Sequence, residues 1–156
     1  MNITAMYFSG TGTTKKVTAA IADELTEIKI SQDETAADEN PGSIKADIKP
    51  WQRAEDIDFT PPAARREIYR FTPDDLVVFG VPVIAGRVPN VLLKFLDTLQ
   101  GGGALAVPVV LYGNRNFDDA LIELRNILQD RGFYAIGAAA FIGEHSFSRI
   151  LAAGRP

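Results

Sequence analysis

Four hydroxyl side chains and two glycines stand together near the start of the chain, in a pattern suited to binding an anion. The stretch is Ser9-Gly10-Thr11-Gly12-Thr13-Thr14, and it separates an apolar run from a segment with helical spacing. Glycines let a backbone turn tightly and approach a ligand closely. The unpaired N–H groups of a helix's first turn attract negative charge, and the hydroxyls add further donors. The pattern predicts a phosphate site that needs no positive side chain inside the loop.

Two other phosphate-binding motifs do not match this stretch. A dinucleotide-binding fingerprint needs a third glycine three residues after Gly12, where this chain has Lys15. A nucleoside triphosphate loop needs Gly-Lys followed by Ser or Thr, whereas Lys15 is followed by Lys16 and Val17. The pattern Ser/Thr-x-Thr-Gly-x-Thr is left. The alternative is an ordinary helix cap that is rich in glycine and threonine.

The composition excludes several other kinds of site. The chain has no cysteine, which excludes a disulfide scaffold, a thiol nucleophile and an iron–sulfur cluster on this chain. A single histidine, His145, disfavours a histidine-rich metal site, and we expect it to be structural. The formal net charge of −4 disfavours nucleic acid as a partner. No apolar stretch is long enough to span a bilayer and none resembles a signal peptide, so we expect a cytoplasmic protein without a membrane partner.

Strands and helices alternate along the chain and must position this loop. Apolar runs predict buried parallel strands at 3–8, 76–79, 107–112 and 133–142. The second strand is either 27–30 or 55–59, and we prefer the latter as the member of the sheet. This alternation predicts right-handed crossovers and an α/β fold with a parallel sheet, in a single domain over 1–156.

Apolar residues on one face predict three helices. The first follows the glycine-rich stretch and carries Val17, Ile21 and Leu25. The second is opened by Pro89, ends at 101–103 and buries the stripe Leu92, Phe95, Leu96 and Leu99. The third is capped by Asn116, with Asp118 and Asp119 in its first turn, and ends at Gly132.

Two stretches depart from this alternation. Residues 32–50 are polar, and acidic in their first part, which indicates a solvent-exposed insertion. Pro61, Pro62 and Pro73 argue against a full crossover helix between 61 and 74.

Four further segments resemble those of a known family. They are 79–90 (FGVPVIAGRVPN), 112–121 (YGNRNFDDAL), 143–148 (GEHSFS) and 152–156 (AAGRP). Together with the Ser9–Thr14 loop they resemble the flavodoxin family. The chain is most similar to the flavodoxin-like domains of a subgroup whose members often carry a C-terminal ferredoxin-type domain.

The resemblance implies a fold and a cofactor. The fold is a flavodoxin-like three-layer sandwich with a five-stranded parallel sheet in the order 2-1-3-4-5, and FMN lies at the carboxyl edge of the strands. Carried over by position, the residues that hold the phosphate are Ser9, Gly10, Thr11, Gly12, Thr13 and Thr14. Those beside the isoalloxazine ring are Pro82, Val83, Ile84, Ala85, Gly86 and Arg87. Those at its pyrimidine edge are Gly113, Asn114 and Arg115.

Two arginines and a phenylalanine have alternative roles. Arg115 either neutralises the anionic reduced flavin or is a solvated arginine near a helix start. Phe117 either stacks on the ring or anchors its helix. Arg87 contacts the flavin or a partner, or is a surface charge.

The implied function is electron transfer through bound FMN. The alternatives are an FMN-dependent oxidoreductase that acts on a quinone or similar acceptor, and a flavin-free binding module with this fold. The implied partners are a redox protein, a fused ferredoxin-type domain or a second copy of the chain in a homodimer.

Two departures from the flavodoxin pattern carry expectations of their own. Ile84 stands where many flavodoxins place an aromatic residue, so the stacking contribution of about 0.5–1.5 kcal/mol is lost. A flavodoxin ends with a fifth helix packed on the sheet, and only fourteen residues follow Ile142. We expect that helix to be missing. The chain is then either a fragment, or an apolar face is open to another molecule.

Overall fold

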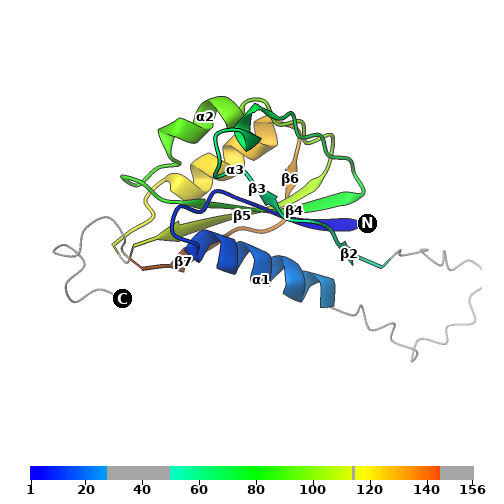
Figure 1. The fold of residues 1–156 in the computed structure, drawn as a ribbon, viewed down its shortest axis with the longest axis horizontal. Helices are drawn as coiled ribbons and strands as arrows, with labels where there is room; N and C mark the ends of the chain where they lie inside the picture. The colour runs from blue at the N-terminus through cyan, green and yellow to red at the C-terminus, as the bar shows by residue number, and fades with distance from the viewer. Residues whose placement is uncertain (28–49, 114, 145–156) are drawn as a thin grey trace, which may run out of the picture.

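One parallel sheet and three α-helices position the predicted binding loops. The computed structural model describes residues 1–27, 50–113 and 115–144. Helix α1 lies on one face of the sheet, and α2 and α3 lie on the other (Figure 1). The elements are β1 (Asn2–Tyr7), α1 (Thr13–Glu27), β2 (Gln52–Arg53), β3 (Ile57–Asp58), the 3₁₀ helix η1 (Ala64–Arg66), β4 (Asp75–Pro82), α2 (Asn90–Leu96), β5 (Leu105–Tyr112), α3 (Ala120–Asp130), β6 (Tyr134–Ala135) and β7 (Ala139–Ile142).

The sheet is parallel throughout and has five strand positions. The three long strands β1, β4 and β5 form its centre, and each is buried along most of its length. Each outer position is shared by two short strands: β2 and β3 both pair with β1, and β6 and β7 both pair with β5. The order across the sheet is β2-β1-β4-β5-β6, with β3 sharing the edge position of β2, and β7 that of β6. When the five positions are numbered along the chain, this is the flavodoxin-like order 2-1-3-4-5, which confirms the predicted fold class.

The sheet separates two apolar clusters. The larger cluster lies between the sheet and helices α2 and α3, and its aromatic centre is Phe59, whose ring lies 5.3 Å from that of Phe79 and 4.9 Å from that of Phe95. The smaller cluster lies under α1, where Val17, Ile21 and Leu25 are only partly buried. The predicted apolar face of this helix is thus rotated from the fully buried line Thr14, Thr18 and Ala22.

The first helix approaches the sheet closely at Gly80 on β4. A Cβ atom at Gly80 would lie 2.0 Å from the Thr18 hydroxyl oxygen and 3.1 Å from the Thr14 methyl carbon. The Thr18 hydroxyl instead donates a hydrogen bond to the Thr14 carbonyl at 2.7 Å. Only glycine permits this approach, which fixes the start of α1 over the ends of β1 and β4.

The outer edge of the sheet confirms one preferred strand and changes another. Strand β3 lies within the preferred range 55–59, and β2 extends the same edge. Of the alternative range 27–30, Glu27 closes α1 and residues 28–30 lie outside the described residues. The last strand, predicted as continuous, is broken into β6 and β7 beside Pro108, which has no N–H to donate. The outer strand has one extra residue there, because Ala106 pairs with Ala135 but Val109 pairs with Ala139.

Two helix ends differ from their predictions. The second helix ends at Leu96, not at 101–103, because the amides of Thr98 and Leu99 bond back three residues and tighten the last turn. The third helix begins at Ala120, so Asn116 is not its cap. The Asn116 side chain instead accepts a hydrogen bond from the Asp118 amide at 3.1 Å.

The remaining expectations concern irregular stretches. Between 61 and 74 the only helix is η1, as the prolines predict. The predicted insertion at 32–50 lies outside the described residues except for Pro50, as do His145 and the other residues after Glu144. Among residues 1–27, 50–113 and 115–144, no helix has the length and apolar character that crossing a membrane requires.

Candidate functional site

Three loops meet at the carboxyl edge of the sheet. They follow the neighbouring strands β1, β4 and β5, and parallel strands bring their carboxyl ends together at one edge (Figure 1, left). We call residues 9–14 the phosphate loop, residues 82–87 the second loop and residues 113–117 the third loop. Asn114, predicted for the third loop, lies outside the described residues.

The phosphate loop is held at its two ends and leaves its central amides free. The Ser9 amide donates to the Thr60 hydroxyl at 2.8 Å, and the Lys15 amide donates to the Ser9 hydroxyl at 3.0 Å. Within the described part of the chain, the amides of residues 10–14 have no hydrogen-bond acceptor. These are the unpaired donors expected at the start of α1, where the helix dipole is positive.

The two glycines of this loop have room at their α-carbons. Among the described residues, a Cβ atom built at Gly10 or at Gly12 meets no heavy atom within 4 Å. Gly12 has φ 89°, a conformation that favours glycine. Thr11 is exposed, whereas Thr14 is only 4% exposed with its methyl carbon toward Gly80. Amides that have no acceptor among the described residues, at the start of a helix, suit a phosphate group.

Two residues outside the predicted site support this loop. Thr60 accepts the Ser9 amide, and Arg65 donates to the carbonyl oxygens of Phe59 and Thr60 at 3.0 and 2.6 Å. The Arg65 guanidinium also lies 5.6 Å from the centre of the Phe8 ring. Sequence reasoning missed both residues. The available signal was their position just after the second strand, which borders the first strand in this topology.

The second loop ends in a tight turn. The amides and carbonyls of Ile84 and Arg87 exchange two hydrogen bonds, both of 3.1 Å. The two residues between them, Ala85 and Gly86, have φ 52° and 74°. Positive φ at both central positions defines a left-handed turn that costs a residue with a Cβ, such as Ala85, about 1 kcal/mol.

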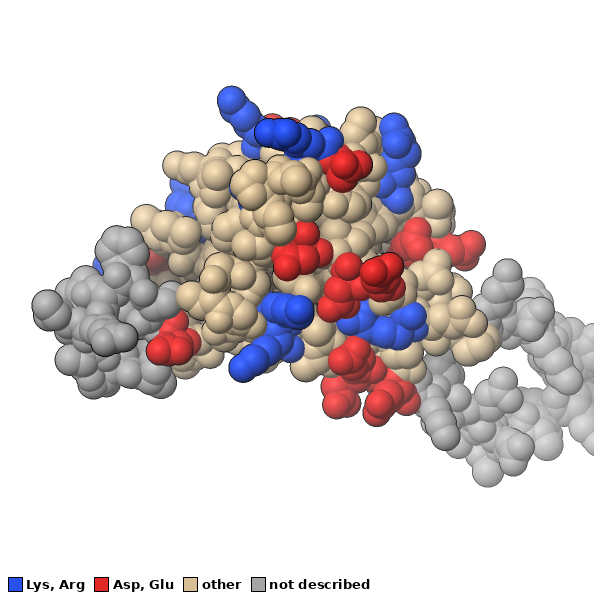
Figure 2. All heavy atoms as spheres, viewed as in Figure 1, with Lys and Arg blue, Asp and Glu red and all other residues tan. Residues whose placement is uncertain are grey.

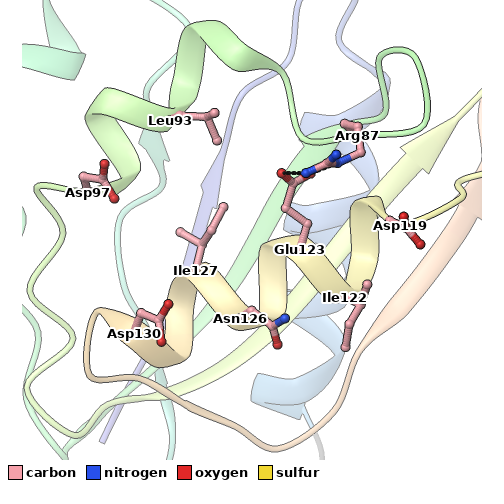
Figure 3. A pocket seen from close by; sticks show the side chains of 9 residues that line it. All are labelled: Arg87, Leu93, Asp97, Asp119, Ile122, Glu123, Asn126, Ile127 and Asp130. Atoms are coloured by element: carbon pink, nitrogen blue, oxygen red, sulfur yellow. Dashed lines mark hydrogen bonds and ion pairs between the residues drawn. The ribbon is translucent and has the colours of Figure 1, made fainter.

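Glu123 of α3 binds the last residue of this loop, Arg87, and the following residue, Val88. Its carboxylate accepts hydrogen bonds from the Arg87 Nε at 2.9 Å, from an Arg87 terminal nitrogen at 2.6 Å and from the Val88 amide at 2.8 Å. Figure 3 shows the Arg87 side chain directed at Glu123. The hydrogen bonds from Arg87, and to a lesser extent the one from Val88, hold the pKa of Glu123 below its usual value.

The residue that follows the third loop contacts the second loop. A Cβ atom at Gly86 would lie 2.5 Å from a carboxylate oxygen of Asp118. The ring of Phe117 lies 5.5 Å from that of Tyr112 and packs against the larger apolar cluster, as a helix anchor does. Arg115 is exposed. The second loop therefore lies against the segment between the third loop and α3, and flavin contact by Arg87, Arg115 and Phe117 stays a prediction.

Two hollows lie away from the phosphate loop. A groove of about 520 Å³ between α2 and α3 is lined by Arg87, Leu93, Asp97, Asp119, Ile122, Glu123, Asn126, Ile127 and Asp130 (Figure 3). Its four carboxylates make it unsuited to a phosphate. A second groove of about 360 Å³ is lined by Val17, Ala20, Ile21, Glu24, Leu25 and Phe141. It lies on the α1 side of the sheet, where we expect an apolar face. Among the described residues, no group of three or more His, Cys, Asp or Glu side chains is placed to hold a metal ion.

The architecture and the site together define a flavodoxin-like α/β fold, and solved structures share it. A flavodoxin from the domain Archaea superposes with a TM-score of 0.58 at 14% sequence identity, over 94% of this chain and 87% of that chain. A flavoprotein from Lactobacillus acidophilus NCFM, solved in complex with FMN, superposes with a TM-score of 0.53 at 15% identity, over 89% of this chain and 92% of that chain. No protein-family model and no curated protein matches the chain. At these identities the likeness shows the fold alone.

Proposed function

We propose that the protein binds one FMN and transfers electrons through it. The observation that carries this proposal is the set of amides at residues 10–14, which have no acceptor among the described residues and lie at the edge where the second and third loops begin. The flavodoxin-like fold, which a structural neighbour solved with FMN shares, also supports the proposal.

The chain's own residues would divide the binding between them. The amides of residues 10–14 and the hydroxyls of Thr11 and Thr13 would donate to the phosphate. The second and third loops would cover the isoalloxazine ring, with backbone N–H groups toward its carbonyl oxygens. Bound FMN supplies one- or two-electron redox chemistry, and the protein's part is to bind it, orient it and limit its contact with water.

A titration with FMN tests this proposal directly. We expect the purified protein to be yellow, or the apoprotein to quench the fluorescence of added FMN at a one-to-one ratio. Heating should release FMN into the supernatant. A colourless protein that also takes up no FMN would refute the proposal and favour the flavin-free binding module.

An FMN-dependent oxidoreductase is the second candidate, and one observation favours it. Ile84, which stands where many flavodoxins have an aromatic residue, is 55% exposed at the second loop. An uncovered aliphatic side chain leaves room for a flat acceptor such as a quinone. Rapid reduction of the holoprotein by NAD(P)H without an added reductase, followed by quinone turnover, would favour the oxidoreductase over the carrier.

Partners and location stay predictions. A redox protein, a fused ferredoxin-type domain or a second copy of the chain would each need a surface beside the flavin edge, and we expect this to happen in the cytoplasm. Figure 2 shows acidic and basic side chains interspersed on the face toward the viewer. That face has no field of one sign, so the net charge of −4 does not by itself define a docking surface there.

A further inference from the structure

One carboxylate on α3 holds the end of the second loop. Three donors converge on Glu123: two nitrogens of Arg87 and the Val88 amide, at 2.9, 2.6 and 2.8 Å. The donors stand 35 or 36 positions earlier in the chain, so the contact joins α3 to the second loop across the fold. Glu123 is the better shielded partner, with a side-chain exposure of 17% against 58% for Arg87.

Few hydrogen bonds fix the turn of the second loop. The Ile84–Arg87 pair of hydrogen bonds closes the turn, and the Val83 amide fixes the inner arm by donating to the Leu111 carbonyl at 2.7 Å. The outer arm, Arg87 and Val88, is fixed by Glu123. Because Ala85 carries a Cβ and has φ 52°, the turn stores strain at that residue that its anchors must oppose.

The same anchor sets the spacing of two loops. Gly86 lies against the Asp118 side chain, and Asp118 stands two residues before the start of α3. Glu123 lies in the first turn of that helix. The start of α3 and the residue before its cap therefore both contact the second loop, and the third loop leads directly into them.

We infer that Glu123 is a positioning residue that holds the second loop against α3 and thereby fixes the walls of the isoalloxazine site. Glu123 does so through Arg87 and Val88, without contact to the flavin. This inference rests on the proposed function. It also reassigns the predicted flavin contact Arg87 to a structural task, because Glu123 occupies two of its guanidinium nitrogens.

The test uses two variants of Glu123 and a matched control. Glu123→Ala removes all three hydrogen bonds, while Glu123→Gln keeps the shape and an acceptor for the Val88 amide but loses the charge. Asp130→Asn neutralises a carboxylate on the same helix and the same groove, away from the second loop. FMN and riboflavin affinities, the flavin reduction potential and backbone hydrogen exchange at 84–88 would be measured for each.

We expect Glu123→Ala to weaken FMN and riboflavin binding equally, by about tenfold, as loss of a supporting residue typically does. Its reduction potential should shift and its exchange at 84–88 should rise. Glu123→Gln should fall between wild type and Glu123→Ala, and Asp130→Asn should match wild type. If Glu123 acts by positioning the loop beside the isoalloxazine ring, FMN and riboflavin should lose affinity equally, since both carry that ring. A general loss of folding would also raise hydrogen exchange in β1 and β4.

The outcomes separate the two proposals. If the wild type binds no FMN, the proposed function fails, and the inference fails with it. If the wild type binds FMN but both Glu123 variants bind it with unchanged affinity and potential, the inference alone is overturned. If Glu123→Ala does not fold, Glu123→Gln decides, because it preserves the packing of the carboxylate.

Discussion

The two halves of the proposed site are built in different ways. The phosphate loop uses backbone amides from one continuous stretch, residues 10–14, at the start of α1. The second and third loops depend on side chains from other elements: Glu123 fixes Arg87, and Asp118 lies against Gly86. The first half takes its amide donors from one local stretch of main chain, with Thr60 supporting its first residue from elsewhere in the chain. The second half is assembled from long-range side-chain contacts.

This difference determines how each half responds to change. Backbone donors persist under most substitutions as long as the helix starts in the same place. A wall held by one carboxylate changes when that carboxylate changes. We therefore expect phosphate recognition to be robust, and the environment of the ring to be adjustable through few residues.

The largest expected effect comes from a substitution in β4, the strand that supports both halves of the site. Strand β4 carries Gly80 beneath α1 and leads into the second loop. Gly80→Ala would place a Cβ 2.0 Å from the Thr18 hydroxyl oxygen, force α1 away from the sheet and lower the free energy of unfolding by about 3 kcal/mol. Urea unfolding would measure this. Adding Thr18→Ala should restore part of the loss, and a Gly80→Ala protein as stable as wild type would contradict the close approach.

The next effect breaks the phosphate half alone. Thr11→Glu adds a carboxylate at an exposed position of the phosphate loop, beside the expected dianion. Repulsion should weaken FMN binding by about a hundredfold and leave riboflavin binding unchanged, since riboflavin has no phosphate. Ala20→Glu, at an exposed position about 10 Å beyond the first residue of α1, is the matched control. Equal losses for both ligands would place the phosphate elsewhere.

The local half is also the half that the sequence predicts well. Ser9–Thr14 lies between an apolar run and a helical pattern, so its conformation follows from nearby residues, and the parallel sheet follows from the alternation of elements. Thr60 and Arg65 were missed although the expected strand order places the second strand beside the first. Their hydrogen bonds come from the irregular stretch after that strand, where no periodic pattern indicates which groups meet.

The assembled half could not be predicted from local pattern. Arg87 was expected beside the flavin or at the surface, and its partner Glu123 stands 36 positions away on another helix. The short α2 and the late start of α3 have the same origin, because bonds in the last turn and the Asn116–Asp118 contact override the apolar periodicity. Local sequence gives the period of a helix better than its ends.

Two glycines sharpen the comparison at smaller magnitude. Gly86→Ala would place a Cβ 2.5 Å from an Asp118 carboxylate oxygen, at a φ of 74°, and should destabilise the protein by about 1 kcal/mol. Gly10→Ala places its Cβ in open space and should leave the thermal midpoint of unfolding unchanged. If thermal unfolding gives both variants the same shift, the second loop is not more tightly packed than the phosphate loop, and the comparison is wrong.

The smallest expected effect is a pH dependence that separates the two halves. The second pKa of a phosphate monoester is about 6, so FMN loses one negative charge as the pH falls from 7 to 5 and its affinity should fall a few-fold, by about the contribution of one charge. Glu123 has a pKa lowered below its usual 4.5, chiefly by the hydrogen bonds from Arg87. A depressed carboxyl pKa means that its contribution is complete above the usual value and is lost only as the pH falls through the lowered one. Riboflavin affinity should therefore stay constant between pH 7 and 5 while FMN affinity declines, as parallel fluorescence titrations would measure. A parallel decline of both ligands would show that a group on the protein titrates in this window, and the separation of the two halves by pH would be lost.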